Sequence, residues 1–106
     1  MKLLLLLLLA FAPVAIVAQT PKNEPPSYMP PKGFVPDEAT AIRVAEAILI
    51  PIYGQEQIDN EKPLRATLEK GVWTVGGSLK EGYAGGVAVV KLRQKDACVL
   101  YVMHGK

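Results

Sequence analysis

Residues 33–54 read GFVPDEATAIRVAEAILIPIYG, and this stretch decides the fold because it predicts an amphipathic helix. Pro36 is expected at the first helical position, and Asp37 places negative charge at the positive end of the helix dipole. Pro51 is expected to end or kink the last turn, and Gly54 to stop the helix. The apolar stripe, at three- and four-residue spacing, consists of Ala41, Ile42, Ala45, Ile48, Leu49 and Ile52. Such a helix is not stable alone, so the rest of the chain must supply an apolar surface.

The residues after this helix predict four strands that supply the surface. Residues 63–68 alternate in polarity, and residues 72–78 follow a tight turn. Residues 87–93 and 98–104 complete the set, and the short connections indicate an antiparallel meander. The expected fold class is α+β, with one long N-terminal helix packed on one face of a four-stranded antiparallel sheet. The side facing the interior is predicted to be apolar, with Ile42, Ala45, Leu49, Leu64, Leu68, Val90 and Leu92.

The first eighteen residues, MKLLLLLLLAFAPVAIVA, have the layout of a secretory signal peptide. Lys2 gives a short positive region, residues 3–12 are an unbroken apolar run, and Pro13 interrupts it. About 20 apolar residues are needed to span a bilayer, so cleavage after Ala18 is favoured over an uncleaved anchor. We therefore expect a periplasmic or secreted protein whose connection to the membrane is the export signal.

A proline-rich segment follows, because residues 19–32 read QTPKNEPPSYMPPK and contain five prolines. Proline lacks a backbone donor and restricts the residue before it, so this segment predicts an extended tether. The alternative is a proline-rich ligand for an aromatic groove. The folded domain is then expected at residues 33–106.

The charge of the chain argues against a nucleic-acid partner. Without Lys2, eleven basic side chains are set against ten acidic ones, and the basic residues form no continuous stripe. Proteins that bind phosphate backbones concentrate Lys and Arg on one surface. We therefore expect no nucleic-acid binding.

Cys98 and His104 are the single cysteine and the single histidine, so we consider them as a thiol–imidazole pair. Six residues along a strand separate them by about 20 Å, whereas a nucleophile and its base must be in contact. Cys98 is expected to be a small buried hydrophobe and His104 to lie near the surface at a strand end. Asp59 and Glu61 are expected in a solvated polar loop, and no spacing matches a metal site. We expect no catalytic residue, metal or cofactor.

The glycine-rich residues 76–86, GGSLKEGYAGG, predict a bend followed by a mobile connection. They lead into a strand and not a helix, which disfavours a phosphate cradle. Tyr83 is a candidate for partner contact because Tyr is enriched at interfaces, with folding back over the sheet edge as the alternative. Trp73 is expected to anchor the core against the helix, or else to lie with Tyr101 on the open face of the sheet.

An uncovered sheet face is expected because one helix covers one side, and its predicted residues are Val87, Val89, Val99, Tyr101 and Met103. The candidate partner-binding residues of the whole chain are Tyr83, Lys80, Glu81, Tyr101 and His104.

Together these segments resemble the short NTF2-fold immunity proteins of bacterial polymorphic toxin systems. The resemblance extends over residues 33–106 and includes GVWTV at 71–75. Its most distinctive parts are GFVPDEA at residues 33–39 and GYAGG at 82–86. It implies a cone-like α+β fold with a curved sheet, NTF2-like or cystatin-like, and a non-catalytic function, in which the protein binds a cognate toxin and blocks it.

Three functional hypotheses follow. The first is an exported binding protein, a monomer or weak homodimer, that covers the active site of a toxin. The second is a PepSY-like or cystatin-like protease inhibitor or sensor module in the cell envelope. The third, which the apolar interior disfavours, is a small-molecule-binding NTF2-like domain or an enzyme.

Overall fold

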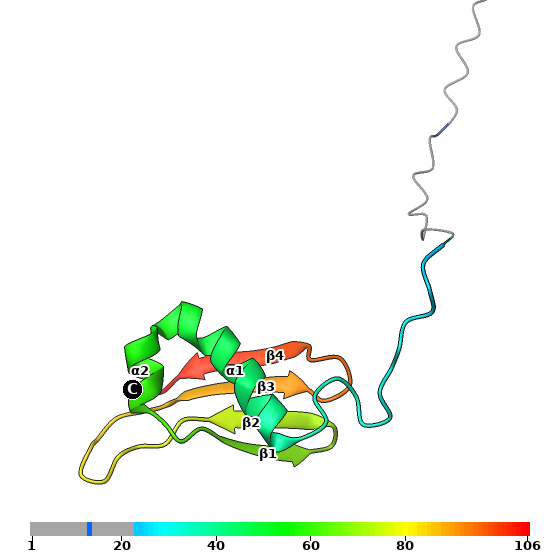
Figure 1. Ribbon diagram of the computed structural model, residues 1–106. Helices are drawn as coiled ribbons and strands as arrows, with labels where there is room; N and C mark the ends of the chain where they lie inside the picture. Colours follow the sequence, from blue (N-terminus) through cyan, green and yellow to red (C-terminus); the bar gives the residue numbers. More distant parts are fainter. Residues whose placement is uncertain (1–12, 14–22) are drawn as a thin grey trace, which may run out of the picture.

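The computed structural model describes Pro13 and residues 23–106 of the chain (Figure 1). Its elements are α1 (Glu38–Tyr53), α2 (Gln55–Asn60), β1 (Arg65–Glu69), β2 (Val72–Gly76), β3 (Ala88–Arg93) and β4 (Val99–His104). Apart from Pro13, the predicted signal peptide lies outside the described residues, as do residues 19–22 of the predicted tether. The described part of the tether, residues 23–32, contains no helix or strand.

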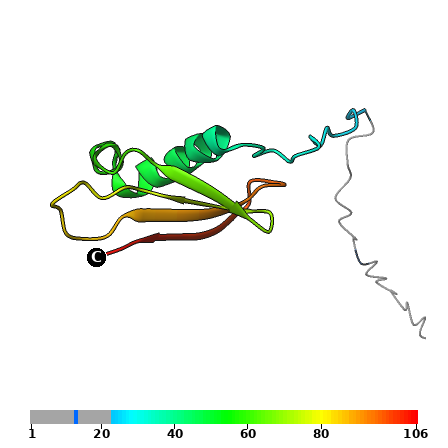
Figure 2. The same cartoon turned by 90° about the horizontal axis from the view of Figure 1, so that it is seen from below.

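The elements form two layers. The four strands are antiparallel in the order β1-β2-β3-β4, and both helices lie on one face of this sheet (Figure 2). Helix α1 contacts β1, β2 and β3. The predicted α+β class and meander are therefore confirmed. Helix α1 has 16 residues, or about 24 Å, which is a moderate length for the helix expected to be long.

Both ends of α1 have a clear local cause. The Asp37 carboxylate is the N-cap, accepting hydrogen bonds from the Thr40 amide at 2.8 Å and the Thr40 hydroxyl at 2.6 Å. Pro36 therefore precedes the cap, and its predicted place at the first helical position is wrong. Pro51 lies within the helix, which continues to Tyr53. Gly54 ends it with a φ of 96°, a conformation that favours glycine, so the predicted stop is confirmed.

The core fills the space between α1 and the sheet. One stripe of α1 is buried against side chains from every strand except β4, and the buried apolar residues are Val35, Ala41, Ala45, Leu49, Ile58, Leu64, Ala66, Trp73, Val75, Ala88, Val90 and Leu92. Trp73 is the predicted core anchor, and its Nε1 donates to the Val35 carbonyl at 2.7 Å. Leu68, which was expected inside, is 44% exposed near the end of the edge strand β1.

The two hairpin turns use different chemistry. Lys70 and Gly71 both have positive φ, as a two-residue hairpin turn requires. At the other turn, Asp96 accepts hydrogen bonds from the Cys98 amide at 3.0 Å and from Arg93 Nη1 at 2.9 Å. This turn holds Cys98 outside the interior, so the sulfur is exposed and the prediction of a buried cysteine is wrong.

The chain enters the domain beside the second turn. The amides of Phe34 and Val35 donate to the carbonyls of Lys95 and Gln94, each at 3.0 Å. Gly33 is buried there, and a side chain at this position would overlap the backbone of Gln94. The tether therefore joins the domain at the end of the sheet where β3 turns into β4 (Figure 1).

Leu49→Ala should lower the free energy of unfolding by about 2–5 kcal/mol, because it leaves a cavity at a fully buried position of α1. Ile52→Ala is the matched control, since Ile52 is 55% exposed on the same helix and its loss should cost about 0.5 kcal/mol or less. Urea unfolding followed by circular dichroism measures both. Equal effects of the two variants would contradict the placement of α1 on the sheet.

Candidate functional site

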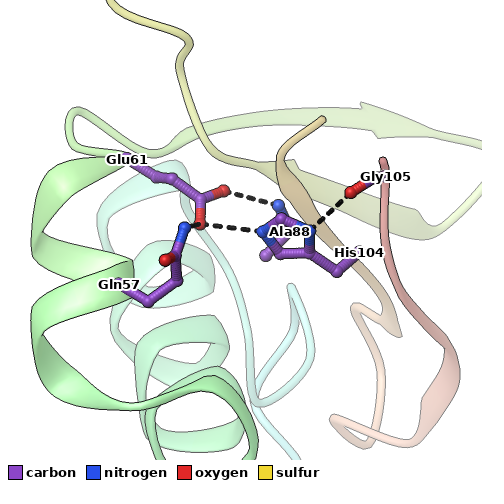
Figure 3. A network of polar contacts seen from close by, with 5 residues as sticks. All are labelled: Gln57, Glu61, Ala88, His104 and Gly105. Atoms are coloured by element: carbon purple, nitrogen blue, oxygen red, sulfur yellow. Dashed lines mark hydrogen bonds and ion pairs between the residues drawn. The ribbon is translucent and has the colours of Figure 1, made fainter. Parts of the chain in front are cut away.

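A buried carboxylate lies immediately after α2. Glu61 is 5% exposed, and Figure 3 shows its side chain turned toward the sheet. Its Oε1 accepts a hydrogen bond from the Ala88 amide at 2.6 Å, and its Oε2 accepts one from Gln57 Nε2 at 3.0 Å. His104 Nε2 lies 3.1 Å from the same Oε2. The prediction that Glu61 is solvated is therefore wrong.

The short helix α2 explains why Glu61 turns inward. Asp59 and Glu61 were expected in a polar loop, but residues 55–60 form a helix, and its fully buried Ile58 fixes this segment against the core. Gln55 Nε2 donates to Asp59 Oδ1 at 2.9 Å across one turn of the helix. Asp59 therefore stays at the surface, as predicted, and pairs with Lys62 at 2.9 Å. Glu61, three residues beyond Ile58, lies on the same side as the core.

The contacts of His104 favour its doubly protonated form. Nδ1 lies 2.7 Å from the Gly105 carbonyl oxygen, which can only accept a hydrogen bond. Nε2 faces the Glu61 carboxylate, which also accepts when it is ionised. When both nitrogens are protonated, His104 is an imidazolium that forms an ion pair with Glu61. The Tyr53 ring lies against the imidazole, with 5.2 Å between the ring centroids.

The pKa values of the two partners move in opposite directions. Hydrogen bonding to the Gly105 carbonyl and then to Glu61 raises the pKa of His104 above 6.5. For Glu61, burial is the largest single influence and would raise its pKa. The hydrogen bonds from Gln57, the Ala88 amide and His104 together outweigh burial, so the pKa of Glu61 falls below 4.5.

A surface hollow of about 310 Å³ lies over this ion pair. It is bounded by α2 and by residues 77–87, the connection between β2 and β3 that we call the β2–β3 loop. Its lining comprises Gln57, Asn60, Glu61, Ser78, Leu79, Lys80, Tyr83, Ala84 and Gly86. Tyr83 is 69% exposed at this hollow, so it does not fold back into the core.

The structure brings together most of the residues predicted to bind a partner. Lys80 and Tyr83 line the hollow, and Glu81 is exposed on the same loop. His104 does not line the hollow but contacts Glu61, which does. Tyr101 is separate, because it pairs with Lys91 in the register of β3 and β4 and therefore lies on the opposite face of the sheet from His104.

The open face of the sheet has the predicted apolar character in part. No element in the described part of the chain covers it, and Tyr101 and Met103 are exposed there next to Val89 (Figure 2). Lys91 Nζ lies 5.7 Å from the centroid of the Tyr101 ring. The register does not place the other two predicted members, Val87 and Val99, on this face. Val87 precedes β3, and Val99 pairs with the inward-facing Leu92 beside an irregularity in the register.

Glu61 is the residue of this site that the sequence did not reveal. It lies 27 positions from Ala88 and 43 positions from His104, so no local pattern reports their contact. The nearest signal is Gly77, where a Cβ atom would lie 2.7 Å from Glu61 Oε1. Gly77 is required because the Glu61 carboxylate leaves no room for a side chain, but in the sequence it cannot be distinguished from any other loop glycine.

Across Pro13 and residues 23–106, no group of three or more His, Cys, Asp and Glu side chains is placed to hold a metal ion. Within the same residues, no helix combines the length and apolar character needed to cross a membrane.

A helical layer on one face of an open four-stranded antiparallel sheet is the arrangement of an α+β cone of the NTF2-like class. Residues 40–106 match the sequence model of the NTF2 fold immunity proteins, and the chain belongs to this family. The family match supports an immunity function in general.

Two proteins of Escherichia coli strain K12 are similar in sequence. The uncharacterized protein YbbC is 36% identical over 76 residues, which cover 71% of this chain and 62% of YbbC. The uncharacterized protein YhhH is 32% identical over 76 residues, which cover 71% of this chain and 60% of YhhH. The chain thus spans about three fifths of the length of these curated relatives. No solved structure matches it.

The ion pair should make stability depend on pH in a defined direction. The raised pKa of His104 contributes stability that is complete below about pH 6.5 and is lost as the pH rises through the folded-state value. The lowered pKa of Glu61 contributes stability that is present above about pH 4.5 and is lost as the pH falls through its folded-state value. The pair is therefore strongest between these limits.

His104→Gln isolates this contribution, because it removes the charge and keeps an amide donor. Urea unfolding across the pH range should show the wild type more stable by about 1 kcal/mol near pH 6, a modest value because the imidazole is partly exposed. The difference should shrink toward pH 9. A difference that is constant with pH would contradict the ion pair.

Proposed function

We propose that this chain is an exported immunity protein that binds a cognate toxin and blocks it sterically, without chemistry of its own. The observation that carries the proposal is an exposed aromatic side chain, Tyr83, beside a hollow on a loop that is fixed at both ends. Membership of the immunity protein family supplies the class of partner.

The proposed contact surface is the β2–β3 loop together with the hollow. Tyr83 and Leu79 are both exposed on this loop, although large apolar side chains usually avoid water. Tyrosine is common among the residues that dominate binding energy, and a hollow beside it can receive a side chain of the toxin. Lys80 and Glu81 supply charged groups around this apolar centre, as expected at the rim of an interface.

Blockade by binding requires only that the complex covers the active site of the toxin. Specific complexes bury about 1,600 Å² in total, which is within reach of a domain of this size. The binding unit in this proposal is a monomer or a weak homodimer. Catalysis by the immunity protein itself has no part in it.

The proposal places the protein in the periplasm or outside the cell, with residues 1–18 removed. The support is the sequence of that segment, with its positive start, apolar run and small residues before Gln19. Expression of the full sequence in bacteria should yield a periplasmic protein whose intact mass, measured by mass spectrometry, is that of residues 19–106. Recovery of the full-length chain from the membrane fraction would contradict cleavage.

Protection against a toxin is the direct test. The candidate toxins are exported proteins encoded beside the gene of this chain, and each can be directed to the periplasm with and without the immunity protein while growth is measured. We expect one of them to be toxic alone and harmless in the presence of this chain. Toxicity that is unchanged by this chain in every case would contradict the proposal.

Two aromatic variants then locate the surface. Tyr83→Ala should weaken binding of that toxin by about 30-fold, corresponding to about 2 kcal/mol for a residue that dominates an interface. Tyr101→Ala is the matched control, because Tyr101 is also exposed but lies on the open face of the sheet. Isothermal titration calorimetry measures both. The reverse order of effects would move the binding site to the open face.

A further inference from the structure

The β2–β3 loop is held at both of its ends by one residue, Glu61. Where the loop leaves β2, the backbone carbonyl of Glu61 accepts a hydrogen bond from the Ser78 amide at 2.7 Å. Where the loop reaches β3, the carboxylate of Glu61 accepts from the Ala88 amide at 2.6 Å, as Figure 3 shows. The two ends are also joined directly, since the Gly77 amide donates to the Ala88 carbonyl at 2.9 Å.

Gly77 begins the loop and Gly86 lies one residue before its end, and at both positions neighbouring groups leave no room for a side chain. At Gly77, a Cβ atom would lie 2.7 Å from the Glu61 Oε1 atom and 2.9 Å from its Cβ atom. At Gly86, a Cβ atom would overlap the backbone of Gly105. The loop ends are therefore fitted against Glu61 on one side and against the end of β4 on the other.

The end of β4 completes this arrangement. His104, the last residue of β4, faces the Glu61 carboxylate, and the Gly105 amide donates to the Val87 carbonyl at 3.1 Å. The carboxylate that holds the loop is thus held in turn by the imidazolium. The apolar contacts of α1 do not replace this connection, because α1 packs on β1, β2 and β3.

We propose that Glu61 and His104 form a clamp that keeps the β2–β3 loop in its binding shape, so that partner affinity follows the charge of this pair. The second half of this statement rests on the proposed function, because it requires a partner that contacts the loop. Glu61 and His104 are positioning residues here, because they hold the loop that carries Tyr83, and Glu61 also lines the hollow. The clamp is closed when the imidazole carries two protons and the carboxylate carries none.

The surroundings of His104 contain few other charges that would obscure its titration. From α1 it faces the Tyr53 ring, and from the residue after α2 it faces Glu61. Its register partner on β3 is Ala88, which carries no side-chain charge. Lys62, next to Glu61 in the chain, is paired with Asp59 and lies 3.8 Å from Glu46.

Loss of the second proton opens the clamp for a stereochemical reason. A neutral imidazole has one donor, so either the Gly105 carbonyl or the Glu61 carboxylate loses its partner. Glu61 also loses the positive charge that offsets its burial, which weakens its hold on the Ala88 amide. The pKa directions of the two groups agree with a clamp that is closed in mild acid and opens as the pH rises.

Amide hydrogen exchange on the free protein, expressed from its full sequence, tests the clamp without a partner. Between about pH 5.5 and about pH 8.5, after correction for intrinsic exchange rates, protection of the hydrogen-bonded amides of Gly77, Ser78 and Ala88 should fall about tenfold. His104→Gln should be insensitive to this change of pH. Glu61→Gln should show low protection at both pH values.

Glu56→Gln is the matched control, because Glu56 carries the same charge on α2 but is exposed. It should behave as the wild type, and circular dichroism of each variant checks that it is folded. Protection that does not depend on pH in the wild type overturns the clamp, as does a dependence that survives in His104→Gln. If Glu61→Gln fails to fold, the comparison of wild type with His104→Gln still decides the result.

Binding then tests the link to affinity. With the toxin identified by the protection experiment, the dissociation constant of the wild type should rise about tenfold over the same pH interval, and that of His104→Gln should stay level. A dissociation constant that does not change with pH in either protein overturns the link between the clamp and affinity. If no toxin is found, the proposed function fails, whereas the exchange experiment still decides whether the clamp exists.

Discussion

A carboxylate removed from water must receive hydrogen bonds from the protein, and the domain meets this requirement for Glu61 with donors from three separate segments. Gln57 comes from α2, the Ala88 amide from the start of β3 and His104 from the end of β4. Each of these segments is therefore placed relative to the others by one acceptor. Among the described residues, no buried side-chain nitrogen or oxygen lacks a partner.

Two kinds of interaction therefore stabilise different parts of the domain. Through most of its length, the apolar stripe of α1 covers β1, β2 and β3, and burial of apolar surface stabilises this part. Strand β4 lies at the edge of the sheet with most of its side chains exposed, so it gains less from the core. The polar contacts of His104 and Gly105 then have a larger share in fixing its last residues.

The apolar part of this design was predictable from the sequence because periodicity reports it directly. The alternation of apolar and polar residues predicted β1–β3 and the inward positions Val90 and Leu92. The three- and four-residue spacing of apolar residues predicted α1. The errors arise where side-chain contacts, which periodicity does not report, decide how a residue is placed. Cys98 has an apolar neighbourhood in the sequence, but the Asp96 side chain holds it in a turn. Glu61 has polar neighbours in the sequence, but Ile58 fixes the segment so that this residue faces inward.

The tether and the β2–β3 loop lie at opposite ends of the sheet. Phe34 and Val35 pair with Lys95 and Gln94 at one end of the sheet, whereas the Glu61–His104 pair and the β2–β3 loop lie at the other. A strand of six residues separates these ends by about 20 Å. The described part of the tether therefore enters the domain at the end of the sheet opposite the loop that carries Tyr83. A large partner can approach this loop without meeting the point where the tether enters.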